Sequence, residues 1–171
     1  MIRSNSNKLL AATLLTLAIG AVNAEPSKTL NGHVTKVFSG DTLQVTDETG
    51  RHHRIRLIGI DAPNTRQTYA QYSTRHLMAS SLDKPVQVLW EHKDRKGMIL
   101  GSVRINGGSV NLSQIEHGCA WFYPAHAQYL DDTVLTYYQD AQAKAKKYRL
   151  GLWFEDKPTE PWLFHAKPVK R

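Results

Sequence analysis

The sequence predicts an α+β fold that is mainly β, and two observations support this. Three strand-like segments, a helix, two more strand-like segments and two helices follow one another along the chain. Turn signals rich in glycine, asparagine and aspartate separate the strand-like segments, and no internal repeat is present. This order suggests a five-stranded OB-fold barrel with about three helices.

The first three strands are short and bounded by turns. Apolar residues alternate with polar ones on both sides of the Ser39-Gly40 turn, which indicates two strands. Thr49-Gly50-Arg51 is a reverse-turn signal, so residues 53–60 are expected to return as the third strand. The alternating residues are Val34, Val37, Leu43 and Val45.

The middle of the chain predicts one helix and two strands. A helix is expected over 69–82, and the Lys84-Pro85 dipeptide ends it. Alternating apolar residues indicate strands at 86–90 and 99–105, joined by a turn at 94–97. The helix residues on the inner side are Ala70, Leu77 and Ser81.

Two further helices are expected in the last third of the chain. Asn111 is suited to cap a short helix that ends at Gly118. The final helix has one apolar face, with acidic residues at its start and basic residues near its end, as suits the helix dipole. Its apolar face comprises Val134, Tyr138, Ala141, Ala145 and Tyr148.

The first 24 residues have the pattern of a signal peptide. Arg3 and Lys8 give a positive start, and residues 9–21 form an apolar run that is too short to span a bilayer comfortably. Val22-Asn23-Ala24 is a small-residue cleavage pattern. An N-terminal membrane anchor or a buried helix is the alternative. We therefore expect export, to the periplasm or as a secreted protein.

After cleavage, residues 25–155 are expected to form a single domain and residues 156–171 a C-terminal tail. The prolines of the tail indicate an irregular strap, which Trp162 and Phe164 would pack onto the barrel. We expect a monomer with no stable membrane span after cleavage.

Composition limits the classes of function. Loss of Arg3 and Lys8 on cleavage lowers the net charge from +7 to +5, and a mildly basic exported domain is compatible with a polyanionic partner. The single cysteine, Cys119, excludes an internal disulfide and lies in an apolar stretch, so it is expected to be a buried small hydrophobe. The histidines are scattered, and none is assigned a ligand role.

Asp41 and Asp61 each stand ten positions from Arg51, on opposite sides of it. In a simple hairpin centred there, the two carboxylates would face each other at its open end, with Arg56 projecting from the returning strand. Such a set suits a hard cation and a phosphate. The residues alone leave open that both aspartates cap turns and that Arg56 pairs with an acid such as Asp47.

Gly40-Asp41-Thr42, followed by Arg56-Leu57-x-x-Ile60-Asp61-x-Pro63, resembles the signature of the staphylococcal-nuclease (thermonuclease) family. The resemblance runs in consistent order over roughly residues 30 to 155 and implies an SNase-like OB fold and nuclease ancestry. Its further motifs are Asp94-Arg95-Lys96-Gly97, Val110-Asn111, Gly118-Cys119-Ala120-Trp121 and Gly151-Leu152-Trp153.

The resemblance also implies roles for site residues. Asp41 and Asp61 correspond to ligands of a calcium ion (Ca2+), and Arg56 corresponds to the arginine that contacts the scissile phosphate. Arg95 and Lys96 lie in the turn that matches the family's, although Lys96 replaces the aromatic usual there. Both are expected near the open end of the barrel, as contacts to nucleic acid. The implied partner is single-stranded or flexible nucleic acid. Tyr123 matches a family aromatic near the nucleotide, where a base could stack, and core packing is the alternative for this residue.

Two family positions are replaced. Asn64 stands where the family carries the glutamate that helps activate the attacking water, and an amide cannot take a proton at neutral pH. Met98 stands where the family carries a second arginine, and its side chain is uncharged. Arg66 and Arg95 are the candidates to replace that charge.

Three functions follow from these residues. The first is an exported, metal-dependent phosphodiesterase (an endonuclease, hence a hydrolase) with weakened activity. The second is a pseudonuclease that binds nucleic acid without cutting it. The third is an envelope interaction module that reuses the OB barrel for a carbohydrate or protein. Asn64 and Met98 favour an impaired nuclease or a pseudonuclease over a fully competent enzyme.

Overall fold

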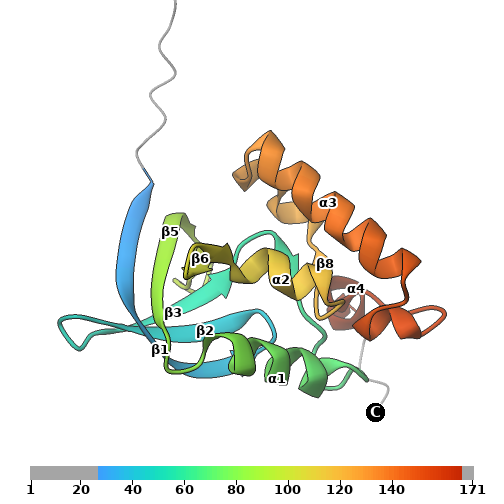
Figure 1. Ribbon diagram of the computed structural model, residues 1–171, viewed down its shortest axis with the longest axis horizontal. Coiled ribbons are helices and arrows are strands. Elements are labelled where there is room, and N and C mark those ends of the chain that lie inside the picture. The colour runs from blue at the N-terminus through green and yellow to red at the C-terminus, as the bar shows by residue number, and fades with distance from the viewer. Residues whose placement is uncertain (1–26, 167–171) are drawn as a thin grey trace, which may run out of the picture.

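The computed structural model describes residues 27–166, which form a five-stranded barrel with helices around it (Figure 1). The signal peptide predicted for residues 1–24 lies outside the described residues. The barrel strands are β1 (Lys28–Ser39), β2 (Thr42–Asp47), β3 (His52–Leu57), β5 (Pro85–Lys93) and β6 (Ile99–Ile105).

Closure of the barrel depends on one parallel pairing. Antiparallel pairs run in the order β3-β2-β1-β5-β6, and β3 then pairs with β6 in parallel over Ile55–Leu57 and Ile99–Gly101. Two register shifts in β1 and one in β5 allow the strong curvature that closure of so few strands needs. The α+β, mainly β, OB-fold prediction is confirmed.

The predicted single strand over 53–60 is wrong. β3 ends at Leu57, and Gly59 adopts a φ of +80°, which turns the chain before β4 (Ile60–Asp61). β4 leaves the barrel and pairs with β8 (Trp121–Phe122), with Asp61 opposite Trp121. A short strand β7 (Gly108–Ser109) pairs antiparallel with the end of β6. The turn at Gly59 therefore directs Asp61 away from the barrel ladder.

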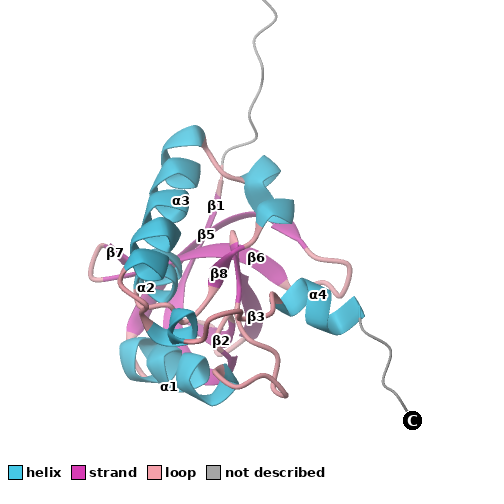
Figure 2. Ribbon diagram, turned by 90° about the vertical axis from the view of Figure 1, so that its right-hand side faces the viewer, coloured by secondary structure: helices cyan, strands magenta, loops and turns pink. Residues whose placement is uncertain are grey.

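Helices cover one side and one end of the barrel. α1 (Ala70–Ser81), α2 (Val110–Glu116) and α3 (Asp132–Lys147) lie along one side, and α4 (Pro161–Ala166) lies on the other side of β8 (Figure 2). Two 3-10 helices complete the fold, η1 (Pro124–Tyr129) and η2 (Gly151–Phe154). None of the helices described is both long and apolar enough to cross a bilayer.

The helix prediction over 69–82 is confirmed by α1, which buries Ala70, Leu77 and Ser81 as expected. The tail differs from the prediction, because Pro161–Ala166 is helical where an irregular strap was expected. Trp162 is half-buried there and packs against the cluster formed by Trp121, Ala145, Leu152 and Trp153.

Two expectations about the later helices are wrong. Ser109, rather than Asn111, caps α2, because its hydroxyl accepts a hydrogen bond from the amide of Leu112. Asn111 is fully buried within the helix instead. Tyr148 follows the end of α3 and is 64% exposed, so the buried face of the helix stops at Ala145.

The core fills the barrel and continues under α2 and α3. Its largest fully buried side chains include Leu43, Ile55, Leu57 and Ile115, and Tyr138 of α3 packs on the same cluster. Cys119 is fully buried, and burial raises the pKa of its thiol to about 12. The expectation of a buried small hydrophobe is confirmed.

Candidate functional site

Arg56 brings the two predicted carboxylates together. Its Nη2 lies 2.6 Å from Oδ1 of Asp61 and 3.5 Å from Oδ2 of Asp41. Both aspartates are 5% exposed, whereas the Arg56 side chain is 25% exposed. The guanidinium therefore bridges two buried acids and keeps one edge toward solvent. It does not pair with Asp47, which binds His53 and the hairpin turn.

Asp41 is held by four groups. Its Oδ1 accepts from the hydroxyls of Ser39 and Thr42, and its Oδ2 accepts from the amide of Ala62 over 3.1 Å. The two hydroxyl contacts are local to the turn, as the turn-cap alternative expects. The Ala62 and Arg56 contacts come from distant parts of the chain, so Asp41 both shapes its turn and joins the site.

The aspartates meet by a different route from the one the sequence suggested. The β2–β3 register pairs Thr42 with Arg56, and the amide of Leu57 donates to the carbonyl of Asp41 over 2.8 Å. The hairpin is therefore not centred on Arg51, and Asp41 lies opposite Leu57. Asp61 returns to Asp41 only because the chain turns at Gly59.

Buried polar side chains support both turns. Asn111 donates from Nδ2 to the carbonyls of Ile58 and Gly101 and accepts at Oδ1 from the amide of Val103. Gln114 of α2 donates to the carbonyl of Gly40. Because each turn is tied to a helix by side-chain hydrogen bonds, the two carboxylates are positioned before any ligand arrives.

The two acids differ in their proton affinity. Burial raises the pKa of Asp61 to about 7, Asp41 adds to the shift, and Arg56 opposes it. Burial also disfavours the charged form of Asp41, but Arg56 and the hydrogen bonds from Ser39, Ala62 and Thr42 outweigh it and lower its pKa. Asp41 therefore stays negatively charged, whereas the charge of Asp61 depends on pH near neutrality.

A hollow of about 410 Å³ opens beside Arg56 and Asp61. Three residues predicted to contact nucleic acid line it together with the Arg56 guanidinium. Those three residues are Arg95, Lys96 and Tyr123. Leu100 and Asp94 also line it, and the Asp94 carboxylate shapes the turn by accepting from the amides of Lys96 and Met98.

Sequence reasoning missed two residues of this hollow, His126 and Trp162. The amide of Gly59 donates to Nδ1 of His126, and burial together with Arg56 lowers the pKa of that imidazole to about 4. Trp162 contacts the ring of Tyr123 with centroids 5.3 Å apart. No local pattern marks either residue, because η1 and α4 are brought to the site by tertiary packing.

The two replaced positions lie outside this hollow. Asn64 is half-buried in the loop after β4, and its Oδ1 accepts from the amide of Arg66. Met98 lies in a neighbouring hollow with Arg54, Lys96 and Gly97. Within residues 27–166, neither Asn64 nor Met98 lines the 410 Å³ hollow.

A small OB barrel that presents an arginine and two buried aspartates beside a basic hollow defines a nuclease-like class of protein. The pattern described as Staphylococcal nuclease homologue matches residues 54–155, which is more than half of the chain. The chain is a nuclease-like member of the staphylococcal nuclease family.

Relatives agree with this assignment. An Escherichia coli protein named "Uncharacterized endonuclease" is 37% identical over 139 residues, covering 81% of this chain and 86% of that protein. The Escherichia coli "Protein ParB" is 31% identical, covering 91% and 90%. The "Micrococcal nuclease" of Shigella flexneri is 30% identical, covering 77% and 78%.

Proposed function

We propose that this protein is an exported, metal-dependent phosphodiesterase scaffold that acts on nucleic acid, with weakened or lost cleavage. The single observation that carries the proposal is the Arg56 guanidinium, which lies between two buried carboxylates and borders the basic hollow. The names of the nuclease relatives support nucleic acid as the partner.

Arg56 is the phosphate contact in this proposal. Guanidinium presents a planar fork of donors to phosphate oxygens, and the carboxylates that hold Nη2 fix the orientation of that fork. Arg95 and Lys96 line the same hollow and add positive charge for the flanking phosphates. Arg95 is also better placed than Arg66 to replace the charge missing at Met98, because Arg66 instead contacts the ring of Phe164.

The donor set fits a hard divalent cation such as Ca2+. Asp41 and Asp61 present carboxylate oxygens that one guanidinium already reaches together, and calcium prefers such oxygen ligands. Within residues 27–166, no third histidine, cysteine or acid completes a cluster with them, so carbonyls and water would supply the other ligands. The ion would neutralise phosphate charge and polarise water when bound.

Weakened cleavage follows from Asn64 and Met98. The Asn64 amide has no basic proton acceptor, and its oxygen already accepts from the amide of Arg66. Loss of a general base and loss of a charged clamp each cost roughly 10²–10³ in rate. The two effects need not add, because residues of one site act as a unit.

A pseudonuclease that binds without cutting is the second candidate. Two observations favour it. The Asn64 side chain accepts from the amide of Arg66 in its own loop, and no carboxylate follows Asn64 closely enough in sequence to replace the missing base. Both candidates share the phosphate contact at Arg56. Cleavage, rather than binding, distinguishes them.

The test is incubation of the purified chain with labelled single-stranded DNA, with calcium or with chelator. Metal-dependent cleavage that Asp41→Ala abolishes and the exposed control Glu116→Ala retains would support a weakened enzyme. Salt-sensitive binding without cleavage would support a pseudonuclease. If neither occurs, the proposed function is wrong.

A second experiment addresses the replaced positions. The double variant Asn64→Glu with Met98→Arg should raise cleavage well above the wild-type rate, since it restores a base and a charge. An unchanged rate would contradict the roles assigned to the two positions.

Export and oligomeric state need separate measurements. Cell fractionation of strains that express the chain with and without residues 1–24 tests export, and analytical ultracentrifugation tests whether the protein is a monomer.

A further inference from the structure

Five aromatic rings form an unbroken series across the face that carries the site. In order they belong to Trp162, Tyr123, His126, Tyr129 and His92, with successive centroid separations of 5.3, 4.7, 5.9 and 4.7 Å. The first three border the hollow beside Arg56. The last two border a different cavity, so the series connects two cavities.

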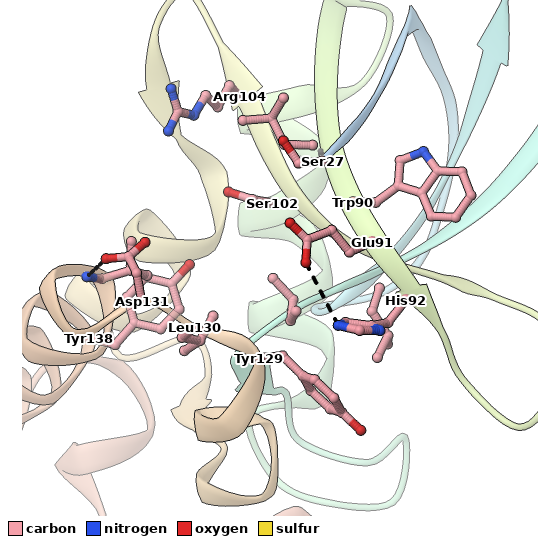
Figure 3. Close-up of a pocket in the computed structure, with 14 residues that line it drawn as sticks. Ser27, Trp90, Glu91, His92, Ser102, Arg104, Tyr129, Leu130, Asp131 and Tyr138 are labelled. Carbon is pink, nitrogen blue, oxygen red and sulfur yellow. Dashed lines mark hydrogen bonds and ion pairs between the residues drawn. The ribbon is translucent and has the colours of Figure 1, made fainter. Parts of the chain in front are cut away.

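The second cavity, of about 230 Å³, lies between the β5–β6 strands and the η1–α3 segment (Figure 3). We call it the β5–α3 cleft. Glu91 is drawn near the middle of the view, with Tyr129 below it, Ser102 above it and Asp131 across from it (Figure 3). Tyr129 is 41% exposed and the His92 side chain is 47% exposed, so both are accessible to a ligand although their rings pack on each other. Nε2 of His92 lies 3.9 Å from the half-exposed Glu91 carboxylate.

The charges of the cleft differ from those of the hollow. Glu91 and Asp131 place two carboxylates in the cleft wall, against one cation, Arg104. Lys28 and Lys93 lie outside the wall, over the ring of Trp90 at 4.9 and 5.6 Å from its centroid. A phosphate is therefore disfavoured inside the cleft, whereas an uncharged planar group with hydrogen-bond donors is favoured.

We propose that the β5–α3 cleft binds an unpaired nucleobase of the same strand whose phosphate lies at Arg56. The inference rests on the proposed function. The aromatic series gives the intervening bases sequence-tolerant stacking surfaces, and the sugar-phosphate chain follows the lysines outside the cleft. A double helix is excluded from this path because its bases are paired and stacked on each other.

The carboxylate of Glu91 gives the cleft a base preference. Guanine presents adjacent N–H donors on its Watson–Crick edge, which a carboxylate accepts together. Thymine presents a single N–H between two carbonyl oxygens, so it gives the carboxylate at most one hydrogen bond and binds there mainly by stacking. The cleft therefore favours guanine over thymine at one position of a bound strand.

Fluorescence anisotropy of the full chain in chelator tests the subsite with two probes, the dinucleotide d(TpT) and the hexamer dT6. Wild type should bind the hexamer more tightly than the dinucleotide. Tyr129→Ala should weaken hexamer binding about tenfold, the order of one lost base–aromatic stack, and leave dinucleotide binding unchanged. Tyr129→Phe and the remote exposed variant Tyr137→Ala should behave as wild type.

A series of hexamers in which one guanine is moved along dT6 tests the preference. Wild type should bind the hexamer with guanine at one particular position more tightly than the others. Glu91→Gln should remove that advantage; it keeps the size of a half-exposed side chain. Equal affinity at every position, or an advantage that persists in Glu91→Gln, would overturn the assignment.

Failure of this inference is distinguishable from failure of the proposed function. If wild type binds both probes equally and Arg56→Ala binds neither, the cleft does not bind a base but the phosphate contact at Arg56 stands. An equal loss of both probes in Tyr129→Ala would also overturn the cleft. Wild type that binds neither probe would overturn both.

Discussion

The backbone amide of Gly59 donates a hydrogen bond to Nδ1 of His126 over 3.2 Å. The carbonyl of the same glycine accepts from the amide of Tyr123. One residue of the β3–β4 turn thus fastens η1 to the site. Because Nδ1 accepts, the proton of the neutral imidazole lies on Nε2.

His126 should remain neutral until the solution is acidic. Burial and Arg56 lower its pKa to about 4, so NMR titration should show a midpoint near pH 4 and an Nε2–H tautomer at neutral pH. Its unfolded pKa is about 6.5, so its contribution to stability is lost as pH falls from 6.5 to 4. A midpoint near 6.5 would contradict the observed burial.

Asp61 should give the opposite pH dependence. Its pKa is raised to about 7 from an ordinary value of 3.8, so the folded state binds the proton more tightly. The stability from the protonated form is fully present below pH 3.8 and is lost as pH rises through 7. Urea denaturation without divalent cations should show this slope, and Asp61→Asn should remove it while Glu116→Gln retains it. An identical slope in Asp61→Asn would disprove the assignment.

Gly59 and Gly50 form a matched pair for a backbone test. Their φ values are +80° and +82°, so alanine is strained at both. A Cβ at Gly59 would lie 2.6 Å from the Tyr138 ring, whereas Gly50 faces open space. Gly59→Ala should therefore lower the free energy of unfolding by about 1–3 kcal/mol more than Gly50→Ala. Equal denaturation midpoints would show that Tyr138 moves aside freely.

Asn111→Ala should destabilise the fold by about 3 kcal/mol, because the buried groups that it satisfies lose their partners. Chemical denaturation measures the effect, and Asn31→Ala on the exposed face of β1 is the control. Binding at Arg56 should weaken as well, because Asn111 holds Ile58 in the turn. A loss no larger than that of Asn31→Ala would refute this role.

Cys119 should resist thiol reagents in the native protein. It is fully buried, and burial raises the pKa of its thiol to about 12, so very little thiolate exists at pH 8. Reaction with Ellman's reagent should be slow in buffer and rapid in denaturant. Rapid native reaction would reveal local opening of the segment between α2 and β8.

The sequence predicted the fold because local signals and packing agree in most elements. Ile99–Ile105 is a strand where alternation predicted one, and α1 buries the face that its periodicity indicates. The break after Leu57 was not predictable, because residues 58–61 are as apolar as a strand and only the pairing of β4 with β8 redirects them. Asn111 resembles a cap in sequence and is instead a buried bridge, which only the adjacent strands reveal.

The meeting of the three site residues was predicted, but from a hairpin centred on the wrong residue. Asp41, Asp61 and Arg56 do meet, but the turn at Gly59 brings them together, rather than the symmetry of the hairpin. His126 and Trp162 lie 65 or more positions along the chain from Asp61 (126 − 61 = 65). No spacing rule connects such residues, because packing of η1 and α4 decides where they lie.

The parallel seam between β3 and β6 includes Arg56 itself, paired with Leu100 on one side and with Thr42 on the other. A fluctuation that opens this seam would displace Arg56 while most of the hydrogen-bonded ladder is still intact. Phosphate contact at Arg56, as proposed above, would therefore be linked to closure of the barrel, and a bound phosphate should slow amide exchange along the seam first.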